Sequence, residues 1–447
     1  MTPVLDVKDR YLADFRRLAV NGRAGAPWVR EMREAAIARF AELGFPTMRQ
    51  EEWRFTSVAA IAETTFAPTH TLPPASVAAS QLEPLLLSGT RCPRLVFVNG
   101  RYAKTLCSSA GLPAGVKAGS LAPALTADAG LARQHLARYA PYQTSTFAAL
   151  NTAFLHDGAF VYVPAGVVLE QPLELLFIST ADQGRTVSHP RNLVVVERGG
   201  RATVVETYAA LADGVYWTNA VTEFVLGDGG HAEYYRIQRE SPQAYHIATT
   251  QFYQGRDSVL LVHPMAFGAA LARHDINTVL DGSGAELTLN GLCLLGGKQH
   301  VDHHTVIDHA KPHCTSHEYL NGVVDDRAHS VFTGRIIVRK GAQRTDSKQT
   351  NNNLVVSEDA RADSQPQLEI YADDVKCTHG STVGPLDQTA LYYLQSRGLG
   401  PEEARSVLTY GFGAEILARM ESAELRTALD RLVRARLAEG ARRREAA

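Results

Sequence analysis

The stretch NNNLVVSEDARADSQPQLEIYADDVKCTHGSTVG, residues 351–384, decides the fold of this chain. It closes a long middle section rich in β-favouring residues and leads into a C-terminal section with helical patterning. It also contains a closely spaced pair of soft metal ligands, Cys377 and His379. Two residues apart on a strand, their side chains point to the same face. Spacing alone leaves two interpretations open: an iron or zinc ligand pair, or an ordinary cysteine beside a hydrogen-bonded histidine.

Short β-favouring runs precede this stretch from about residue 154 onward and continue into it. They include LELLFIST at 173–180, ATVVETY at 202–208, AELTLNGLCLL at 285–295 and LEIYADDVKC at 368–377. Corners rich in Gly and Asp separate the runs and recur about every 27–29 residues, which is typical of stacked coils. No long helical pattern interrupts them, which disfavours alternating strand–helix units. A sandwich or a solenoid remains, and the corners favour a mainly β chain with a parallel β-helix core.

Helical patterns flank this core and predict three parts. Residues 1–150 are expected to form a mostly helical domain with a small hairpin at 95–106, where Asn99-Gly100 suits a two-residue type I′ turn. Residues 151–384 are expected to form the β-helix core. Residues 385–447 are expected to be helical, since Pro401 followed by two glutamates suits the first turn of a helix.

The composition excludes several classes of function. The chain has 447 residues, a net charge of −2, 45% hydrophobic and 21% charged residues, as in soluble globular proteins. The charge gives no reason to expect nucleic acid or an anionic membrane as a partner. Five scattered cysteines form no CxxC motif, which fits a reducing cytoplasm. No stretch has the pattern of a signal peptide or a membrane span.

A histidine-rich run, QHVDHHTVIDHAKPHCTSH at 299–317, is a second candidate metal site. Its candidate ligands are His309, His313 and Cys314. The spacing matches neither HExxH nor a zinc finger, and alternation along strands would divide the histidines between two faces. Metal binding and solvent-facing or stacked histidines are therefore both open interpretations.

Motifs for nucleotide hydrolysis and for acyl transfer are absent from the sequence. Gly296-Gly297-Lys298 lacks the spacing and the following Ser or Thr of a P-loop, and neither GxSxG nor a Rossmann GxGxxG occurs in the required context. We therefore expect no enzyme activity, and ATP to act only through another chain. An alternative of a different class is a β-helix enzyme acting on polysaccharides, although no paired set of carboxylates and basic residues indicates its groove.

Several segments together resemble the SufB/SufD family of iron–sulfur cluster assembly subunits. They are TNNNLVV at 350–356, PQLEIYADDVKCTHGSTVG at 366–384, LYYLQSRGL at 391–399, LVFVNGR at 95–101 and EEWRFTS at 51–57. The resemblance covers nearly the whole chain. Two types of subunit in the family are alternatives for this chain. The Cys-Thr-His-Gly at 377–380 is similar to the SufD type, whereas the SufB type carries acidic residues at this place.

The resemblance implies a right-handed parallel β-helix between two helical domains, acting as a non-catalytic scaffold. Its implied partners are a SufB-like paralogue at the core and a SufC-like ABC-type ATPase at the C-terminal helices, near Tyr410 and Phe412. His379 and Cys377 would meet iron or a transient cluster at the paralogue interface. No cofactor is expected to stay bound to the chain alone, and the resemblance associates a reduced flavin with the complex. For the isolated chain, a monomer and a homodimer paired through the paralogue face are both open interpretations.

Overall fold

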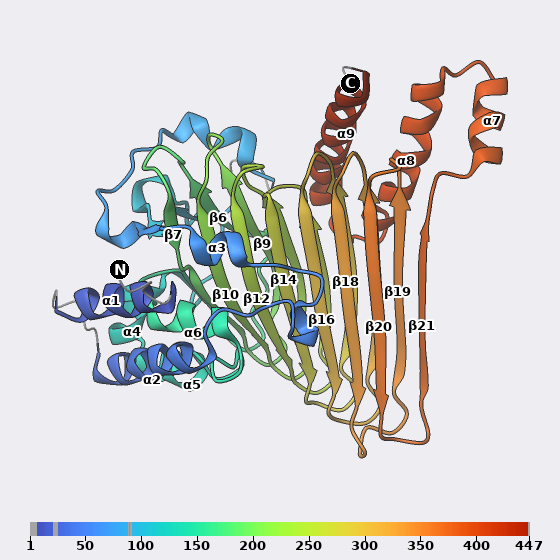
Figure 1. Cartoon of the computed structure of the whole chain (residues 1–447). Helices are drawn as coiled ribbons and strands as arrows, with labels where there is room; N and C mark the ends of the chain where they lie inside the picture. Colours follow the sequence, from blue (N-terminus) through green and yellow to red (C-terminus); the bar gives the residue numbers. More distant parts are fainter. Residues whose placement is uncertain (1–6, 21–25, 88, 90–91, 446–447) are drawn as a thin grey trace.

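The computed structural model describes residues 7–20, 26–87, 89 and 92–445. Figure 1 shows helices packed at one end of a long wall of strands and further helices over the upper edge of its other end. The wall consists of two sheets that form a solenoid, and their strands pair in parallel except for β2 with β3 and β4 with β5. The predicted mainly β solenoid with helices on both sides is therefore confirmed.

Eleven strands form the first sheet in the described part of the chain, in the order β20-β18-β16-β14-β12-β10-β8-β5-β4, with β1 and β7 beside this path. Their bounds are β1 (Ala67–Pro68), β4 (Lys117–Ser120), β5 (Ala159–Val163), β7 (Thr186–Ser188), β8 (Arg191–Val196), β10 (Trp217–Leu226), β12 (Tyr245–Gln254), β14 (Leu271–Leu280), β16 (His300–His309), β18 (His329–Val338) and β20 (Arg361–Ile370).

Ten strands form the second sheet over the same described ranges, in the order β21-β19-β17-β15-β13-β11-β9-β6-β2-β3. Their bounds are β2 (Arg94–Val98), β3 (Arg101–Tyr102), β6 (Leu173–Ser179), β9 (Arg201–Ala210), β11 (His231–Arg239), β13 (Val259–Ala266), β15 (Glu286–Leu295), β17 (Thr315–Val324), β19 (Asp346–Val355) and β21 (Lys376–Gly384).

From β8 and β9 onward, each coil of the solenoid contributes one strand to each sheet, so neighbours in a sheet are alternate strands in sequence. In-register parallel pairing then stacks equivalent side chains above one another. Phe97, Phe177 and Tyr208 show this in the interior, because their rings stack with centroids 4.8 Å apart at each step. That distance is the spacing between hydrogen-bonded strands. The sheets therefore enclose one continuous apolar core at this end.

Close stacking of the corners explains why glycine recurs there. A Cβ atom at Gly282 would lie 1.9 Å from the backbone nitrogen of Arg256 on the preceding coil. One predicted run is corrected: residues 368–377 are not a single strand, because residues 371–375 turn between β20 and β21. Asp373 lies in this corner and accepts a hydrogen bond from the Gln343 amide at 2.7 Å.

Six α-helices in the described residues precede β5: α1 (Val7–Val20), α2 (Pro27–Leu43), α3 (Ala59–Glu63), α4 (Leu121–Ala127), α5 (Ala129–His135) and α6 (Thr146–Ala153). The hairpin predicted at 95–106 forms between β2 and β3, with positive φ at Asn99 and Gly100, and residues 104–106 form a 3-10 helix instead of continuing the strand. It joins the solenoid, since β2 pairs with β6 of the second sheet. Residues 46–58, the N-terminal strap, lie against the first sheet through Trp53, whose ring contacts the Arg273 guanidinium.

Three helices follow β21: α7 (Gln388–Ser396), α8 (Pro401–Leu417) and α9 (Ala423–Glu445). Apolar side chains of α8 and α9 pack against the second sheet; they include Ile416 and Leu429, which meet Leu292 and Val323 in one buried cluster. Figure 1 shows α7 beside α8 and beyond the sheet. No helix in the described ranges combines the length and the apolar character needed to cross a bilayer.

Candidate functional site at the terminal coil

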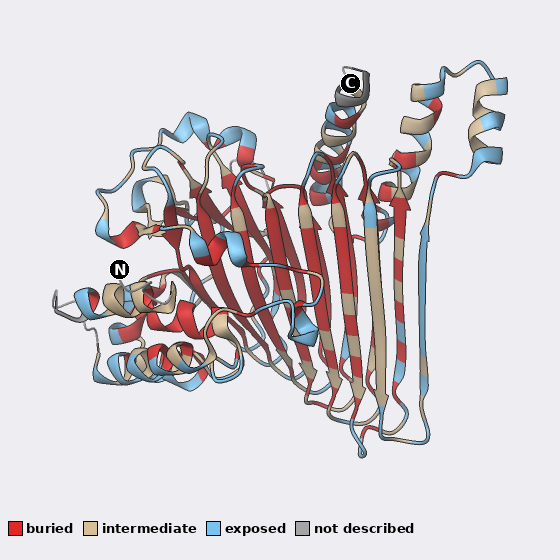
Figure 2. Cartoon of the chain, in the orientation of Figure 1, coloured by how far each residue is buried: buried red, intermediate tan, exposed pale blue. Residues whose placement is uncertain are grey.

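The last coil of the solenoid is open to solvent. Strands β20 and β21 end the two sheets, so each has a strand partner on one side only in the described structure. Figure 2 shows the change along the wall, from buried central strands to the half-buried β20 and the exposed β21. Two large apolar side chains near this edge are strongly exposed, Tyr371 at 62% and Val383 at 51%. An unpaired edge with apolar side chains is a surface suited to association.

Cys377 and His379 lie on β21 and share the face that looks into the solenoid. Their register neighbours on β19, Ser347 and Gln349, are buried in the interior. Cys377 packs against the interior apolar cluster, and Ser381 on the same face bonds across to Ser364 of β20 at 2.8 Å. His379 is nevertheless exposed, because no coil follows. The predicted shared face of the pair is thus present, and it stands at the open end.

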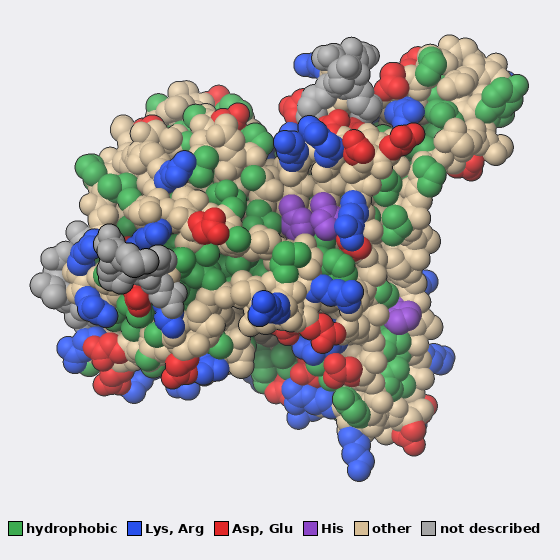
Figure 3. All heavy atoms as spheres, in the orientation of Figure 1, with side chains coloured by type: hydrophobic (Ala, Val, Ile, Leu, Met, Phe, Trp, Pro, Cys, Tyr) green, Lys and Arg blue, Asp and Glu red, His purple; other side chains and the backbone are tan. Residues whose placement is uncertain are grey.

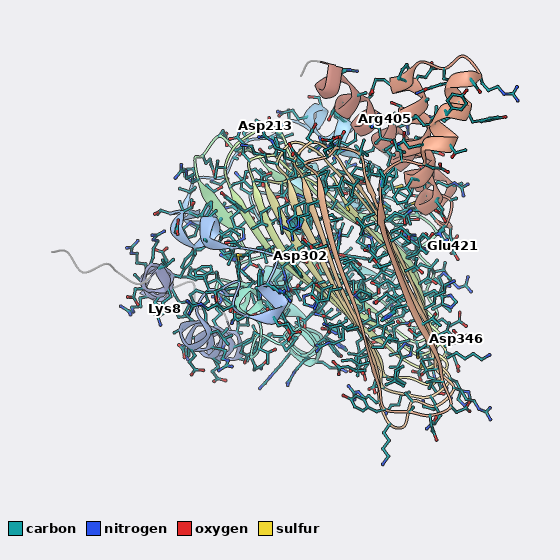
Figure 4. All side chains as sticks on the ribbon, turned by 45° about the vertical axis from the view of Figure 1, so that its right-hand side comes forward. Lys8, Asp213, Asp302, Asp346, Arg405 and Glu421 are labelled. Atoms are coloured by element: carbon teal, nitrogen blue, oxygen red, sulfur yellow. The ribbon has the colours of Figure 1, made fainter. Side chains whose placement is uncertain are left out.

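The Cys377 thiol is in an environment that lowers its reactivity in the isolated chain. Burial raises the pKa of Cys377, and the nearby carboxylate of Asp346 raises it further. Figure 4 places Asp346 on the wall near the open end of the solenoid. A thiol of raised pKa stays protonated at neutral pH, and a metal ligand must be deprotonated. Cys377 therefore needs a nearby positive charge, such as bound iron, before it can act as a ligand.

Two buried polar residues lie behind His379 in the solenoid: Gln349 is one coil further in and Glu318 is two coils further in. Gln349 on β19 donates its Nε2–H to Oε2 of Glu318 on β17 at 2.6 Å. Both side chains are almost completely buried, with 0% and 1% exposure. Burial raises the pKa of Glu318 to about 7, although the hydrogen bond from Gln349 opposes the rise. Sequence reasoning missed both residues, because nothing in the local pattern distinguishes them from surface polar residues.

The asparagines at 351–353 form a structural ladder of hydrogen bonds within β19 and to the preceding coil. Asn353 donates to Asn351 at 2.7 Å, and Asn351 donates to the Leu320 carbonyl on the coil beneath at 3.3 Å. Asn352 points to the other face and bonds to the Tyr319 hydroxyl at 3.2 Å. The ladder fixes β19 directly beside the strand that carries Cys377.

The histidine-rich run covers β16, the corner after it and the start of β17, and its histidines lie on different faces. Figure 3 shows histidines gathered on the outer face, where the rings of His300 and His329 lie 4.7 Å apart. His309 instead points inward and bonds to Ser316 at 2.8 Å, His313 lies in a corner with φ 63°, and Cys314 contacts the Gly282 carbonyl. In the described residues, no three His, Cys, Asp or Glu side chains are placed to hold a metal ion. The proposed site at His309, His313 and Cys314 stays a prediction.

Tyr410 and Phe412 on α8 are already engaged within the chain. The Tyr410 hydroxyl bonds to Asp430 of α9 at 2.5 Å, and Phe412 packs with the cluster between the helices and the second sheet. Their role as partner contacts stays a prediction. On α7 the structure leaves two aromatic side chains uncovered, Tyr393 at 55% and Tyr392 at 73% exposure.

Fold and site together define an open-ended β-solenoid flanked by helical domains, with a thiol and an imidazole at its free end. Comparison with known proteins then gives the family. The profile described as "SUF system FeS cluster assembly, SufBD core domain" matches residues 177–412, and "SufBD protein N-terminal region" matches residues 8–175. The chain belongs to the SufBD family of iron–sulfur cluster assembly proteins, and within it to the SufD type.

Individual relatives cover most of the chain. An iron–sulfur cluster assembly SufBD family protein of Synechocystis is 33% identical over 415 residues, 90% of each chain. The iron–sulfur cluster assembly protein SufD of Escherichia coli is 30% identical over 408 residues, 91% of this chain and 92% of that protein. SufD of Bacillus subtilis is 30% identical over 275 residues, 60% of this chain. The chain is thus an iron–sulfur cluster assembly subunit of the SUF system.

Proposed function

We propose that the chain is a non-catalytic scaffold subunit whose open terminal coil pairs with a SufB-like paralogue. The observation that carries this proposal is the unpaired edge at β20 and β21, which presents Cys377 and His379 at the same end. Main-chain groups along such an edge bind another strand readily. Apolar side chains beside it, Tyr371 and Val383, would be covered by the partner.

Iron and sulfide are the cargo of this site in the proposal. A thiolate and an imidazole are ligands that iron accepts, but two protein groups do not complete the coordination of a cluster. The paralogue would supply the remaining ligands, so the site exists only in the complex. A reduced flavin is a further proposed component of the complex, and we assign it no residues on this chain.

An ABC-type ATPase resembling SufC would dock on the C-terminal helices. The exposed side chains of Tyr392 and Tyr393 on α7 and Val407 on α8 support this placement, because they form the uncovered apolar part of these helices. ATP would act only through that partner. Movement of two bound ATPases would pull on the helices of both scaffold subunits and change the core interface. The five cysteines are all free, which supports a cytoplasmic location.

Co-purification of the three chains tests the pairing. Val383→Lys places a charge at the proposed interface, and complex formation with the paralogue should fall at least tenfold while the chain stays folded. Val168→Lys is the matched control, since Val168 is 38% exposed but outside the terminal coil. Equal loss in both variants, or no loss in either, contradicts the proposed edge. Without the paralogue, the same edge is expected to give homodimers that Val383→Lys disrupts in size-exclusion chromatography.

A further inference from the structure

The buried pair Glu318 and Gln349 lies directly behind His379 in the solenoid interior. Gln349 and His379 are register neighbours on β19 and β21, and Glu318 is the register neighbour of Gln349 on β17. Neighbouring strands are about 4.8 Å apart, so inward side chains in register lie one above the next. The three residues therefore form a column that ends at the open coil.

The hydrogen bond to Glu318 fixes which way the Gln349 amide points. Its NH₂ group faces β17, where Glu318 accepts from Nε2 at 2.6 Å. When Glu318 is ionised, the opposite orientation would set the amide oxygen against a carboxylate oxygen, and only the first orientation gives a hydrogen bond. Gln349 Oε1 consequently faces the other side, toward β21. Oε1 is buried and has no hydrogen-bond partner among the described residues.

The next side chain in the column is the His379 imidazole, whose ring N–H is a donor of the kind that this oxygen lacks. A buried acceptor without a partner is unfavourable, so the arrangement favours a ring orientation of His379 that supplies the bond. The second ring nitrogen would then carry the lone pair and face the open end. Histidines that bind metals are commonly fixed in this way by an acceptor on their other nitrogen.

We propose that Glu318 and Gln349 are positioning residues that set the tautomer of His379. Glu318 orients the Gln349 amide, Gln349 Oε1 accepts the N–H of one ring nitrogen, and the other ring nitrogen is presented to iron at the subunit interface. Only the last clause rests on the proposed function. The tautomer itself is a property of the isolated chain.

Nuclear magnetic resonance of the full chain with ¹⁵N-labelled histidine tests the tautomer directly. The His379 signals are assigned by their loss in His379→Asn. One tautomer should dominate, and Gln349→Leu should shift the ratio by about fivefold, as expected for one hydrogen bond. Glu318→Leu should shift it in the same direction, because the amide is then free to rotate. Ser347→Ala, the matched interior change beside Cys377, should leave the ratio unchanged.

An unchanged tautomer ratio in both Gln349→Leu and Glu318→Leu overturns the inference, and an equal shift in Ser347→Ala does so too. A shift confined to the first two variants supports it. Cluster content of the co-purified complex is measured separately. If the tautomer shifts while His379→Ala complexes keep their iron, the positioning stands and the proposed role of His379 fails.

Discussion

The guanidinium of Arg273 lies over the indole ring of Trp53, with 3.8 Å between its central carbon and the ring centroid. Trp53 belongs to the N-terminal strap and Arg273 to β14, 220 positions further along the chain. Arg273 is 2% exposed, bonds to Asp302 at 2.8 Å, and donates to the Glu52 carbonyl of the strap. One buried cation therefore fastens the N-terminal segment to the outside of the solenoid.

Trp53→Ala should destabilise the chain strongly, by about 3 kcal/mol, because it removes a large buried ring and leaves the buried guanidinium without its cover. Urea unfolding followed by circular dichroism measures the change. Arg339→Ala is the control. The Arg339 side chain, paired with Asp308, is 55% exposed, so this ion pair should contribute less than about 1 kcal/mol to the free energy of unfolding. Equal effects of the two changes would contradict the fastening role of the strap.

The stability of the chain should depend on pH through Glu318. Its pKa is raised to about 7 in the folded chain from an ordinary value near 4.5. The folded state thus favours the protonated carboxyl group. The contribution of Glu318 to the free energy of unfolding is therefore fully present below about pH 4.5 and is lost as the pH rises through about 7. Glu318→Gln removes this titration, and its stability advantage over the parent chain should grow by up to about 3 kcal/mol between pH 5 and pH 9. A constant difference across this range contradicts the raised pKa.

Cys377 should react slowly with iodoacetamide at pH 8, because burial and the Asp346 carboxylate raise the pKa of its thiol. Asp346→Asn removes the negative charge and should increase the alkylation rate by about two- to threefold. Peptide mass spectrometry with time gives the rate at this cysteine. Asp257→Asn, at a carboxylate that is 70% exposed on a corner of an earlier coil, is the control. An alkylation rate unchanged by Asp346→Asn would contradict the role of the Asp346 carboxylate in slowing the reaction.

Docking of the ATPase should depend on α7. Tyr392→Ala is expected to weaken binding of a SufC-like ATPase by about tenfold while leaving the unfolding midpoint unchanged, since Tyr392 is 73% exposed. Tyr410→Ala should instead lower stability, because Tyr410 bonds to Asp430 and stacks with Arg434. Pull-down assays and thermal unfolding of both variants separate the two effects. Loss of binding in Tyr410→Ala alone, with unchanged stability, would favour the contact predicted from the sequence.

Hydropathy and glycine spacing were sufficient to predict the solenoid, yet several of its strands are not recognisable from local sequence. β16 and β19, HVDHHTVIDH and DSKQTNNNLV, lack an apolar alternation. They are strands because their polar side chains bond to the next coil or to the strap, as Asp302 does with Thr56 at 2.7 Å. Such partners are supplied by tertiary structure, and local patterns do not contain them.

The site was predictable in part. The spacing of Cys377 and His379 was enough to place them on one face, and the position of their strand at the end of the β-rich section agreed with a terminal coil. Gln349 and Glu318 were not predictable, because their alignment with His379 requires the register of three strands about 30 residues apart. Corners of unequal length prevent that register from being counted along the sequence.

The most direct measurement is the iron and sulfide content of the complex purified with SufB-like and SufC-like partners, for the parent chain and for His379→Ala. Thr378→Ala is the control on the same strand, with its side chain on the opposite face. We predict that all three complexes form, that the parent and Thr378→Ala complexes carry a cluster, and that His379→Ala complexes lose most of it. A His379→Ala complex with the full content of iron and sulfide would contradict the central claim that the open coil supplies this ligand.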